Sequence, residues 1–149
     1  MRKIFIYYSL SGNGDAVASY LKAKNIDIRK VVAKEPLPNN QILRILSGGF
    51  LAFMKHKDKL DNFDNDISTY DEIIIGSPIW NGRLSCPINT VLNELNLKDK
   101  KVSFILYSGS GDAPKTTKNI KEKYQDVNII HLKEPKNNKE ELNNKLKNV

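Results

Sequence analysis

The sequence predicts an α/β fold in which a doubly wound, five-stranded parallel sheet carries helices on both of its faces. Five short apolar segments, rich in β-branched and aromatic residues, alternate along the 149 residues with segments whose apolar residues recur at helical spacing. The central strand-like segments are apolar at successive positions, which is typical of strands covered on both sides. The length suits one hydrophobic core, so residues 1–149 are predicted to form a single domain.

The first half of the chain supplies two predicted strands and two predicted helices. Residues 3–8 alternate aliphatic and aromatic side chains and form the first strand, and residues 15–24 form a helix after a Gly-rich turn. Residues 26–32 are more polar, which indicates a second strand nearer an edge of the sheet. Residues 41–54 carry apolar side chains at helical spacing, so a helix is expected there, weakened by a pair of glycines.

The second half continues the same alternation. A run of three isoleucines marks the third strand as central, and a proline suits the first turn of the helix that follows it. The predicted elements are a strand at 71–76, a helix from Pro87, a strand at 101–107, a helix at 113–124, a strand at 127–132 and a last helix at 139–146.

Composition and charge exclude several functional classes. The net charge is +7, but only four of the 24 cations are arginines, which favours a solvated basic surface over a nucleic-acid-binding face. No apolar run approaches the roughly 18 residues of a membrane helix, and the N-terminal apolar run is too short for a signal peptide. The single cysteine, Cys86, excludes an internal disulfide framework. We therefore expect a cytoplasmic protein, monomeric or weakly dimeric, that binds neither nucleic acid nor membrane.

Ligands of doubly wound sheets bind outside the carboxyl ends of the strands, where the strand order reverses. The segment after the first strand contains two serines, two glycines and an asparagine just before a helix. Free N–H groups at a helix N-terminus attract anions, and glycines let the backbone approach closely. We therefore favour a phosphate site over an ordinary N-capped helix. Its residues are Ser9, Ser11, Gly12, Asn13 and Gly14.

The segments after the third and fourth strands are the other candidates. Trp80 is the only tryptophan of the chain and is expected on a loop, where an indole can stack on a flat ring, although it could instead fold back onto a helix. This second segment consists of Ser77, Pro78, Ile79, Trp80, Asn81 and Gly82. The third segment offers hydroxyl, amide and carboxylate groups with little bulk, and consists of Ser108, Gly109, Ser110, Gly111 and Asp112.

These residues carry a resemblance. The runs Tyr8-Ser9-Leu10-Ser11-Gly12-Asn13, Gly76-Ser77-Pro78-Ile79-Trp80 and Ser108-Gly109-Ser110-Gly111 resemble the three cofactor loops of the flavodoxin family. The run Ser-Gly-Gly-Phe at residues 47–50 is similar to one subgroup of flavodoxin-like proteins. The resemblance covers the whole chain in element order. It implies the strand order 2-1-3-4-5, FMN as the cofactor and, from the uninterrupted fifth strand, a short-chain flavodoxin.

The resemblance also implies a role for each segment. Residues 9–14 would hold the FMN phosphate, and Trp80 would stack on one face of the isoalloxazine. The backbone at Asn81 and Gly82 would face the flavin N5 edge, where a peptide flip is known in the family. Residues 108–112 would line the pyrimidine side. No acid–base catalyst is expected among these residues.

Two functions remain open for such a protein. The first is an electron carrier, in which the protein binds, orients and tunes the flavin. The second is a small FMN-dependent NAD(P)H or quinone oxidoreductase, for which the third segment, lacking an aromatic ring, leaves room. A scaffold that has lost its flavin is a weaker third reading. Flavodoxins are usually acidic, so the charge of +7 predicts acidic redox partners and a raised reduction potential.

Overall fold

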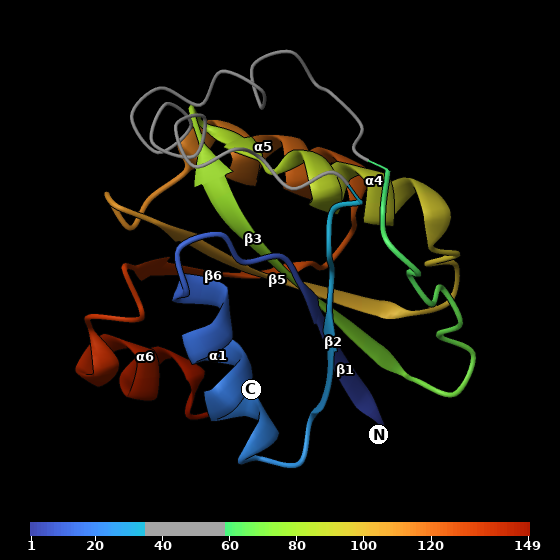
Figure 1. Ribbon diagram of the computed structural model, residues 1–149, viewed down its shortest axis with the longest axis horizontal. Coiled ribbons are helices and arrows are strands. Elements are labelled where there is room, and N and C mark those ends of the chain that lie inside the picture. Colours follow the sequence, from blue (N-terminus) through green and yellow to red (C-terminus); the bar gives the residue numbers. More distant parts are fainter. Residues whose placement is uncertain (35–58) are drawn as a thin grey trace.

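The computed structural model describes residues 1–34 and 59–149. Five parallel strands are ordered β2-β1-β3-β5-β6, and a short strand, β4, pairs antiparallel with β3 (Figure 1). Counted along the parallel strands alone, this is the predicted order 2-1-3-4-5. The strands are β1 (Lys3–Tyr7), β2 (Asp27–Lys30), β3 (Glu72–Trp80), β4 (Arg83–Leu84), β5 (Lys101–Ser108) and β6 (Asn128–Lys133).

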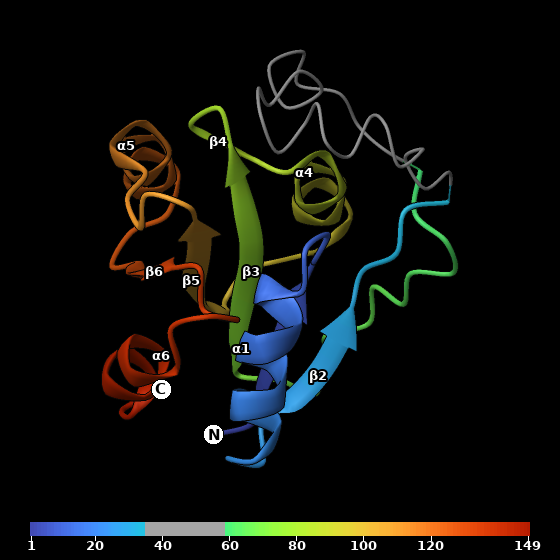
Figure 2. The same ribbon diagram turned by 60° about the vertical axis from the view of Figure 1, so that its left-hand side comes forward.

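Helices cover both faces of the sheet, as the doubly wound prediction requires. Seen from the side of Figure 2, α1 and α6 lie on one face and α4 and α5 on the other. Each pair closes a separate apolar cluster against its face of the sheet. The helices are α1 (Asn13–Lys22), α4 (Cys86–Glu94), α5 (Pro114–Lys123) and α6 (Lys139–Leu146).

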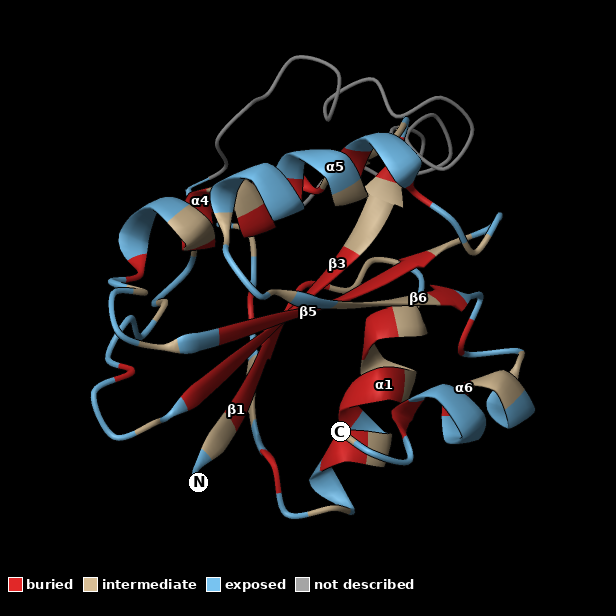
Figure 3. Ribbon diagram, turned by 180° about the vertical axis from the view of Figure 1, so that it is seen from behind, coloured by how far each residue is buried: buried red, intermediate tan, exposed pale blue. Residues whose placement is uncertain are grey.

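The alternation in β1 connects the sequence to these two clusters. Ile4 and Ile6 pack into the cluster under α4 and α5, whereas Phe5 and Tyr7 pack into the cluster under α1 and α6. All four side chains are buried, and Figure 3 shows the central strands buried along most of their length. A strand with two apolar faces is stable only between two layers, so the sequence pattern and the architecture agree.

One prediction about β3 was wrong. The strand was expected to end at residue 76 and to be followed by a loop, but it runs on to Trp80 and folds back as β4. The turn residues Asn81 and Gly82 have φ values of 48° and 69°, the left-handed pair typical of a two-residue hairpin. The Asn-Gly pair is the sequence signal for such a hairpin, and it extends the sheet at this end.

Other boundaries differ less. Helix α1 begins at Asn13, so Asn13 and Gly14 belong to its first turn rather than to the preceding loop. Strand β2 is shorter than expected and exposed at both ends. The predicted helix at 41–54 and the Ser-Gly-Gly-Phe run at 47–50 lie outside the described residues.

Three further features of the described residues concern membrane-spanning helices, metal sites and the single cysteine. Within residues 1–34 and 59–149, no helix has the length and apolar character to span a membrane. The same residues contain no group of three or more His, Cys, Asp or Glu side chains placed to hold a metal ion. Cys86, at the start of α4, is buried and forms no disulfide.

Candidate functional site

The three candidate segments lie at the same edge of the sheet. β1, β3 and β5 are parallel neighbours, and each candidate segment includes or follows the carboxyl end of one of them. The first two segments are joined where the Tyr8 N–H donates to the Gly76 carbonyl at 3.2 Å. The buried Tyr107 hydroxyl, from β5, donates to the Tyr8 carbonyl and joins the third strand to the first segment. The fold therefore brings together residues that the sequence singled out separately.

The first segment leaves the N-terminus of α1 without a side-chain cap. Gly12 occupies the cap position in a left-handed conformation, with φ of 92°, and no side chain there accepts a hydrogen bond from the helix. The alternative of an ordinary N-capped helix therefore does not describe α1. The first turn of the helix retains N–H groups that a bound anion can satisfy.

The Ser9 hydroxyl is a second polar group of this segment. Its Oγ is buried and makes no hydrogen bond of normal geometry with a described group, although the Ser9 hydroxyl helps to lower the pKa of the neighbouring Asp15 carboxyl. A buried hydroxyl without a partner is costly, which favours a ligand at this position. Ser11 and Asn13 lie beyond it, and Asn13 Nδ2 donates to Ser11 Oγ at 3.3 Å.

Gly14 lets α1 approach the sheet closely. A Cβ at this position would lie 2.5 Å from Tyr107 Oη, 2.8 Å from a Tyr7 ring carbon and 3.0 Å from Ser9 Cβ. All three neighbours come from the strands or from the first segment, so the close approach fixes the start of α1 against the ends of β1 and β5. Gly14 is thus a packing residue of the site as well as a member of the predicted phosphate loop.

Asp15 places a carboxylate close to the predicted anion site, but it is neutralised locally. Lys30 Nζ lies 2.7 Å from Asp15 Oδ1, and the Tyr7 hydroxyl donates to the same oxygen at 2.9 Å. Burial acts to raise the pKa of Asp15, but these hydrogen bonds outweigh it and hold that pKa below its usual value. Burial and the adjacent carboxylate raise the pKa of Tyr7, which keeps its hydroxyl a donor.

Lys136, which sequence reasoning did not identify, also reaches the first segment. It lies in the loop between β6 and α6, and its backbone N–H donates to Asn13 Oδ1 at 3.1 Å. Its Nζ lies 3.5 Å from the Ser11 carbonyl oxygen. The one available signal in the sequence was the position of Lys136 shortly after the fifth predicted strand. It lies in a Lys- and Asn-rich stretch that was attributed to compositional bias.

The second segment differs most from its expected environment. Trp80 was expected on an exposed loop, but it ends β3 and is only 6% exposed. It belongs to the apolar cluster under α4 and α5 and meets the Tyr8 ring edge-on, with the centroids 5.9 Å apart. The expected loop position is therefore wrong, because the hairpin turns this segment into sheet. Stacking of Trp80 on a flavin stays a prediction.

The hairpin also uses the other side chains of the second segment. The Ser77 hydroxyl is fully buried, donates to the Pro78 carbonyl at 2.9 Å and accepts from the Ser85 N–H at 3.1 Å. Ile79 pairs with Leu84 across the hairpin. Ser77 and Ile79 therefore make contacts within the hairpin. The turn itself, at residues 81 and 82, lies beyond the carboxyl end of β3.

A residue of α5 holds that turn. Thr116 Oγ1 donates to the Gly82 carbonyl at 2.6 Å, and the Thr116 side chain is only 3% exposed. No local sequence pattern indicates this contact, since the two residues are 34 positions apart. The hydrogen bond fixes the orientation of the Gly82 carbonyl relative to α5.

The third segment satisfies many of its own polar groups. Ser108 Oγ accepts from the Gly111 N–H at 2.9 Å, and Asp112 Oδ1 accepts from the Ala113 N–H at 2.7 Å. Ser110 Oγ donates to the Asp112 carbonyl at 3.1 Å. A Cβ at Gly109 would meet nothing within 4 Å. The segment is thus a turn stabilised by its own hydrogen bonds, with open space beside Gly109.

Comparisons with known proteins agree with this arrangement. Residues 2–149 match a family model described as Flavodoxin. The chain belongs to the flavodoxin family. No curated protein sequence matches this flavodoxin. Similar solved structures include a candidate flavoprotein from Bacteroides eggerthii, with 25% identity and a TM-score of 0.70, covering 86% of this chain and 84% of that one.

A second similar structure is a flavoprotein from Lactobacillus acidophilus solved in complex with FMN. It is 23% identical to this flavodoxin, with a TM-score of 0.64, and the match covers 87% of this chain and 89% of that one. A candidate flavoprotein from Bacteroides uniformis is 19% identical with a TM-score of 0.67, and covers 86% and 85% of the two chains. These likenesses confirm the flavodoxin-like fold that the sequence predicted.

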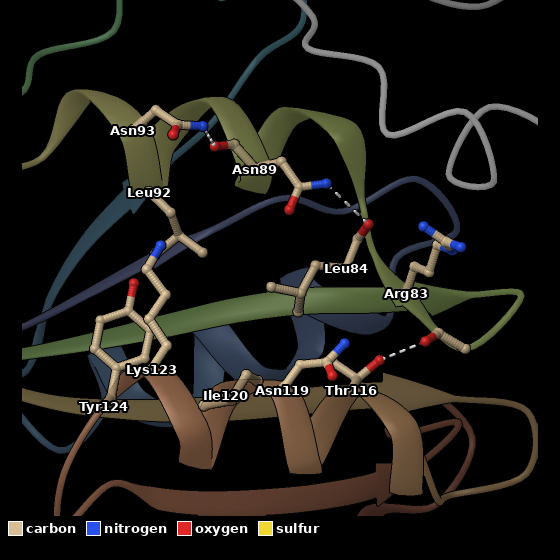
Figure 4. Close-up of a pocket in the computed structure, with 11 residues that line it drawn as sticks. Arg83, Leu84, Asn89, Leu92, Asn93, Thr116, Asn119, Ile120, Lys123 and Tyr124 are labelled. Carbon is tan, nitrogen blue, oxygen red and sulfur yellow. Dashed lines mark hydrogen bonds between the residues drawn. The ribbon is translucent and has the colours of Figure 1, made fainter.

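A groove lies beside the site of this flavodoxin. Figure 4 shows it between α4 and α5. Gly82 is one of its lining residues, and its volume is about 440 Å³. Arg83 lies at one end and Lys123 at the other, and no acidic residue is among the described residues that line it. Leu84, Leu92 and Ile120 provide apolar walls. The groove therefore has a cation at each end, with apolar and uncharged polar side chains between them.

Proposed function

We propose that this flavodoxin binds FMN at the carboxyl edge of its sheet and serves as an electron carrier. The observation that supports it most is the start of α1, which has no side-chain cap and lies beside the buried Ser9 hydroxyl. Donors of this kind fit a phosphate dianion. Membership of the flavodoxin family and the FMN complex of the Lactobacillus relative support FMN over other phosphorylated ligands.

Each segment has a proposed task in binding. Ser9, Ser11 and the N–H groups of residues 12–14 would hold the phosphate, and the hairpin turn at residues 81 and 82 would face the N5 edge of the ring. Trp80 would contact the ring from the end of β3, and residues 108–112 would line its pyrimidine side. FMN, when bound, supplies the redox chemistry, and the protein binds it, orients it and limits its contact with water.

The partners and setting of the carrier belong to the same proposal. We expect acidic redox proteins, because the chain carries a charge of +7 and the groove beside Gly82 has cations at both ends. Positive charge near the flavin stabilises its anionic reduced form, which raises the reduction potential. A cytoplasmic protein, monomeric or weakly dimeric, suits this role.

One observation favours a second function, a small FMN-dependent NAD(P)H or quinone oxidoreductase. The third segment carries no aromatic ring, and the space around Gly109 is open. A substrate could therefore reach a flavin face that a second stacking ring would otherwise cover. Steady-state oxidation of NAD(P)H in the presence of a quinone, catalysed by the FMN-loaded protein, would favour this enzyme over the carrier.

An absorption spectrum tests FMN binding. The purified protein, mixed with FMN and desalted, is expected to retain the visible flavin bands in proportion to its concentration. Protein unfolded in denaturant and desalted under the same denaturing conditions serves as the control and should lose them. A protein that remains colourless after FMN addition and desalting would contradict both flavin functions and leave the scaffold reading.

Thr116 gives a test at the ring end of the site. Thr116→Val keeps the side-chain shape but leaves the Gly82 carbonyl without its donor, so we expect a loss of about 1 kcal/mol of stability and a shifted midpoint potential of the bound flavin. Thr117→Val is the matched control, because Thr117 lies on the same helix but its hydroxyl pairs with His131 Nε2, at 3.0 Å. Equal midpoint potentials for Thr116→Val and the wild type would remove Thr116 from the flavin environment.

A further inference from the structure

The loop between β6 and α6 places a cation over the predicted phosphate segment. Lys136 is fixed there by its own backbone N–H, which donates to Asn13 Oδ1 at 3.1 Å. Its side chain then crosses Gly12: a Cβ on Gly12 would lie 3.3 Å from Lys136 Cδ and 3.6 Å from Lys136 Nζ. The ammonium group ends 3.5 Å from the Ser11 carbonyl oxygen. The side chain thus lies along the loop instead of extending into solvent.

The ammonium group has no carboxylate partner within 4.0 Å among the described residues. Two carboxylates in the first turns of the two adjoining helices form ion pairs with other lysines. Asp15 of α1 is paired with Lys30 at 2.7 Å, and Glu141 of α6 is paired with Lys145 at 2.5 Å. Lys136 therefore contributes positive charge to the loop without forming an ion pair within 4.0 Å among the described residues.

Three features then converge on one short segment: the uncapped N-terminus of α1, the buried Ser9 hydroxyl and the Lys136 ammonium group. The first two are neutral donors and suit any phosphate monoester. A lysine adds a full positive charge, which interacts most strongly with a dianion. Added salt weakens this interaction by screening. The oxidised flavin ring is neutral, whereas the phosphate is a dianion. The effect of the Lys136 charge on binding must therefore appear at the phosphate end of the ligand.

We propose that Lys136 is a phosphate-binding residue of this flavodoxin and that it selects FMN over riboflavin, which has the same ring but no phosphate. The inference rests on the proposed FMN site. The hydrogen bond to Asn13 comes from the backbone N–H of residue 136 and does not depend on its side chain. We therefore expect the loop to keep its geometry when this exposed residue is substituted. The charge on the phosphate end then sets how strongly affinity depends on ionic strength.

Titration of the flavin-free protein with FMN and with riboflavin, followed by quenching of flavin fluorescence, tests the proposal. Lys136→Gln is expected to weaken FMN binding by about tenfold at low ionic strength and to leave riboflavin binding unchanged. Lys136→Arg should retain most of the FMN affinity because it keeps the charge. The difference between wild type and Lys136→Gln should shrink when salt is raised from about 10 mM to about 500 mM.

Lys98→Gln is the matched control. Lys98 is also exposed, but it precedes β5 and therefore lies toward the opposite edge of the sheet, and its loss changes the net charge equally. This variant should bind FMN like the wild type. Riboflavin binding by Lys136→Gln reports that the variant has folded.

Three results would overturn the proposal. Equal FMN affinities for wild type and Lys136→Gln would remove the lysine from the phosphate site while leaving the FMN function in place. Equal losses of FMN and riboflavin affinity would indicate a structural role of Lys136. A wild-type protein that binds neither flavin would contradict the FMN function itself, and the inference with it.

Discussion

Trp80→Ala is expected to cost the flavin-free protein about 3–5 kcal/mol of unfolding free energy, the loss typical of a large aromatic removed from a core. Trp80 is 6% exposed, and it packs within the cluster under α4 and α5 with its ring edge-on to Tyr8. Chemical denaturation monitored by circular dichroism measures the effect. Because no flavin is present in this experiment, the loss reports the packing of the indole alone.

Trp80→Phe separates packing from flavin binding. Phenylalanine keeps an aromatic ring at the end of β3, so the flavin-free protein should lose clearly less stability than Trp80→Ala. If Trp80 also stacks on the flavin, Trp80→Phe should still retain FMN through desalting, because a ring remains to stack. A Trp80→Ala variant as stable as the wild type would show that the indole does not support the core.

Gly14→Ala is expected to destabilise the protein by about 1–3 kcal/mol, although alanine is the better helix former by about 1 kcal/mol. The new methyl group would lie 2.5 Å from Tyr107 Oη and 2.8 Å from a Tyr7 ring carbon, and both rings are buried. The start of α1 must move away from the sheet to accommodate it. FMN affinity should fall as well, because the same movement displaces the N–H groups of the first turn.

Gly109→Ala is the control for this prediction. A Cβ at Gly109 meets nothing within 4 Å, so its unfolding free energy should stay within about 0.5 kcal/mol of the wild type. Tyr107→Phe provides a second check, since removing the hydroxyl relieves the shortest contact. Gly14→Ala should therefore cost less in the Tyr107→Phe background than in the wild type. Full additivity of the two changes would contradict the contact.

The sheet and its helices could be predicted from local patterns. β1 alternates aliphatic and aromatic residues that enter two different clusters, and this alternation is visible in the sequence. Right-handed crossovers between parallel strands leave few topologies, and the resemblance to the flavodoxin family supplied the strand order among them. The first candidate segment could be recognised because serines and glycines before a helix have a direct physical meaning for anions.

The remaining features depend on tertiary contacts or on competition between local signals. Asn81 and Gly82 were expected in a loop, yet the same pair is the usual turn of a hairpin, and the pairing of Ile79 with Leu84 shows that they form one. Their contact with the cofactor stays a prediction. Lys136 and Thr116 reach the site across 123 and 34 residues of sequence, to Asn13 and Gly82. No spacing rule on a single sequence connects such residues.

The two apolar clusters lie on opposite faces of the sheet, so the proposed FMN site is supported from two different sides. Lys136 and the start of α1 belong to the side of the sheet covered by α1 and α6, whereas Thr116 and the hairpin turn are held from the side covered by α4 and α5. We expect substitutions on the first side to act mainly on how tightly the FMN phosphate is held, and those on the second side to act mainly on the surroundings of the ring. Under this proposal, retention of the flavin and its reduction potential would respond to different substitutions in this fold.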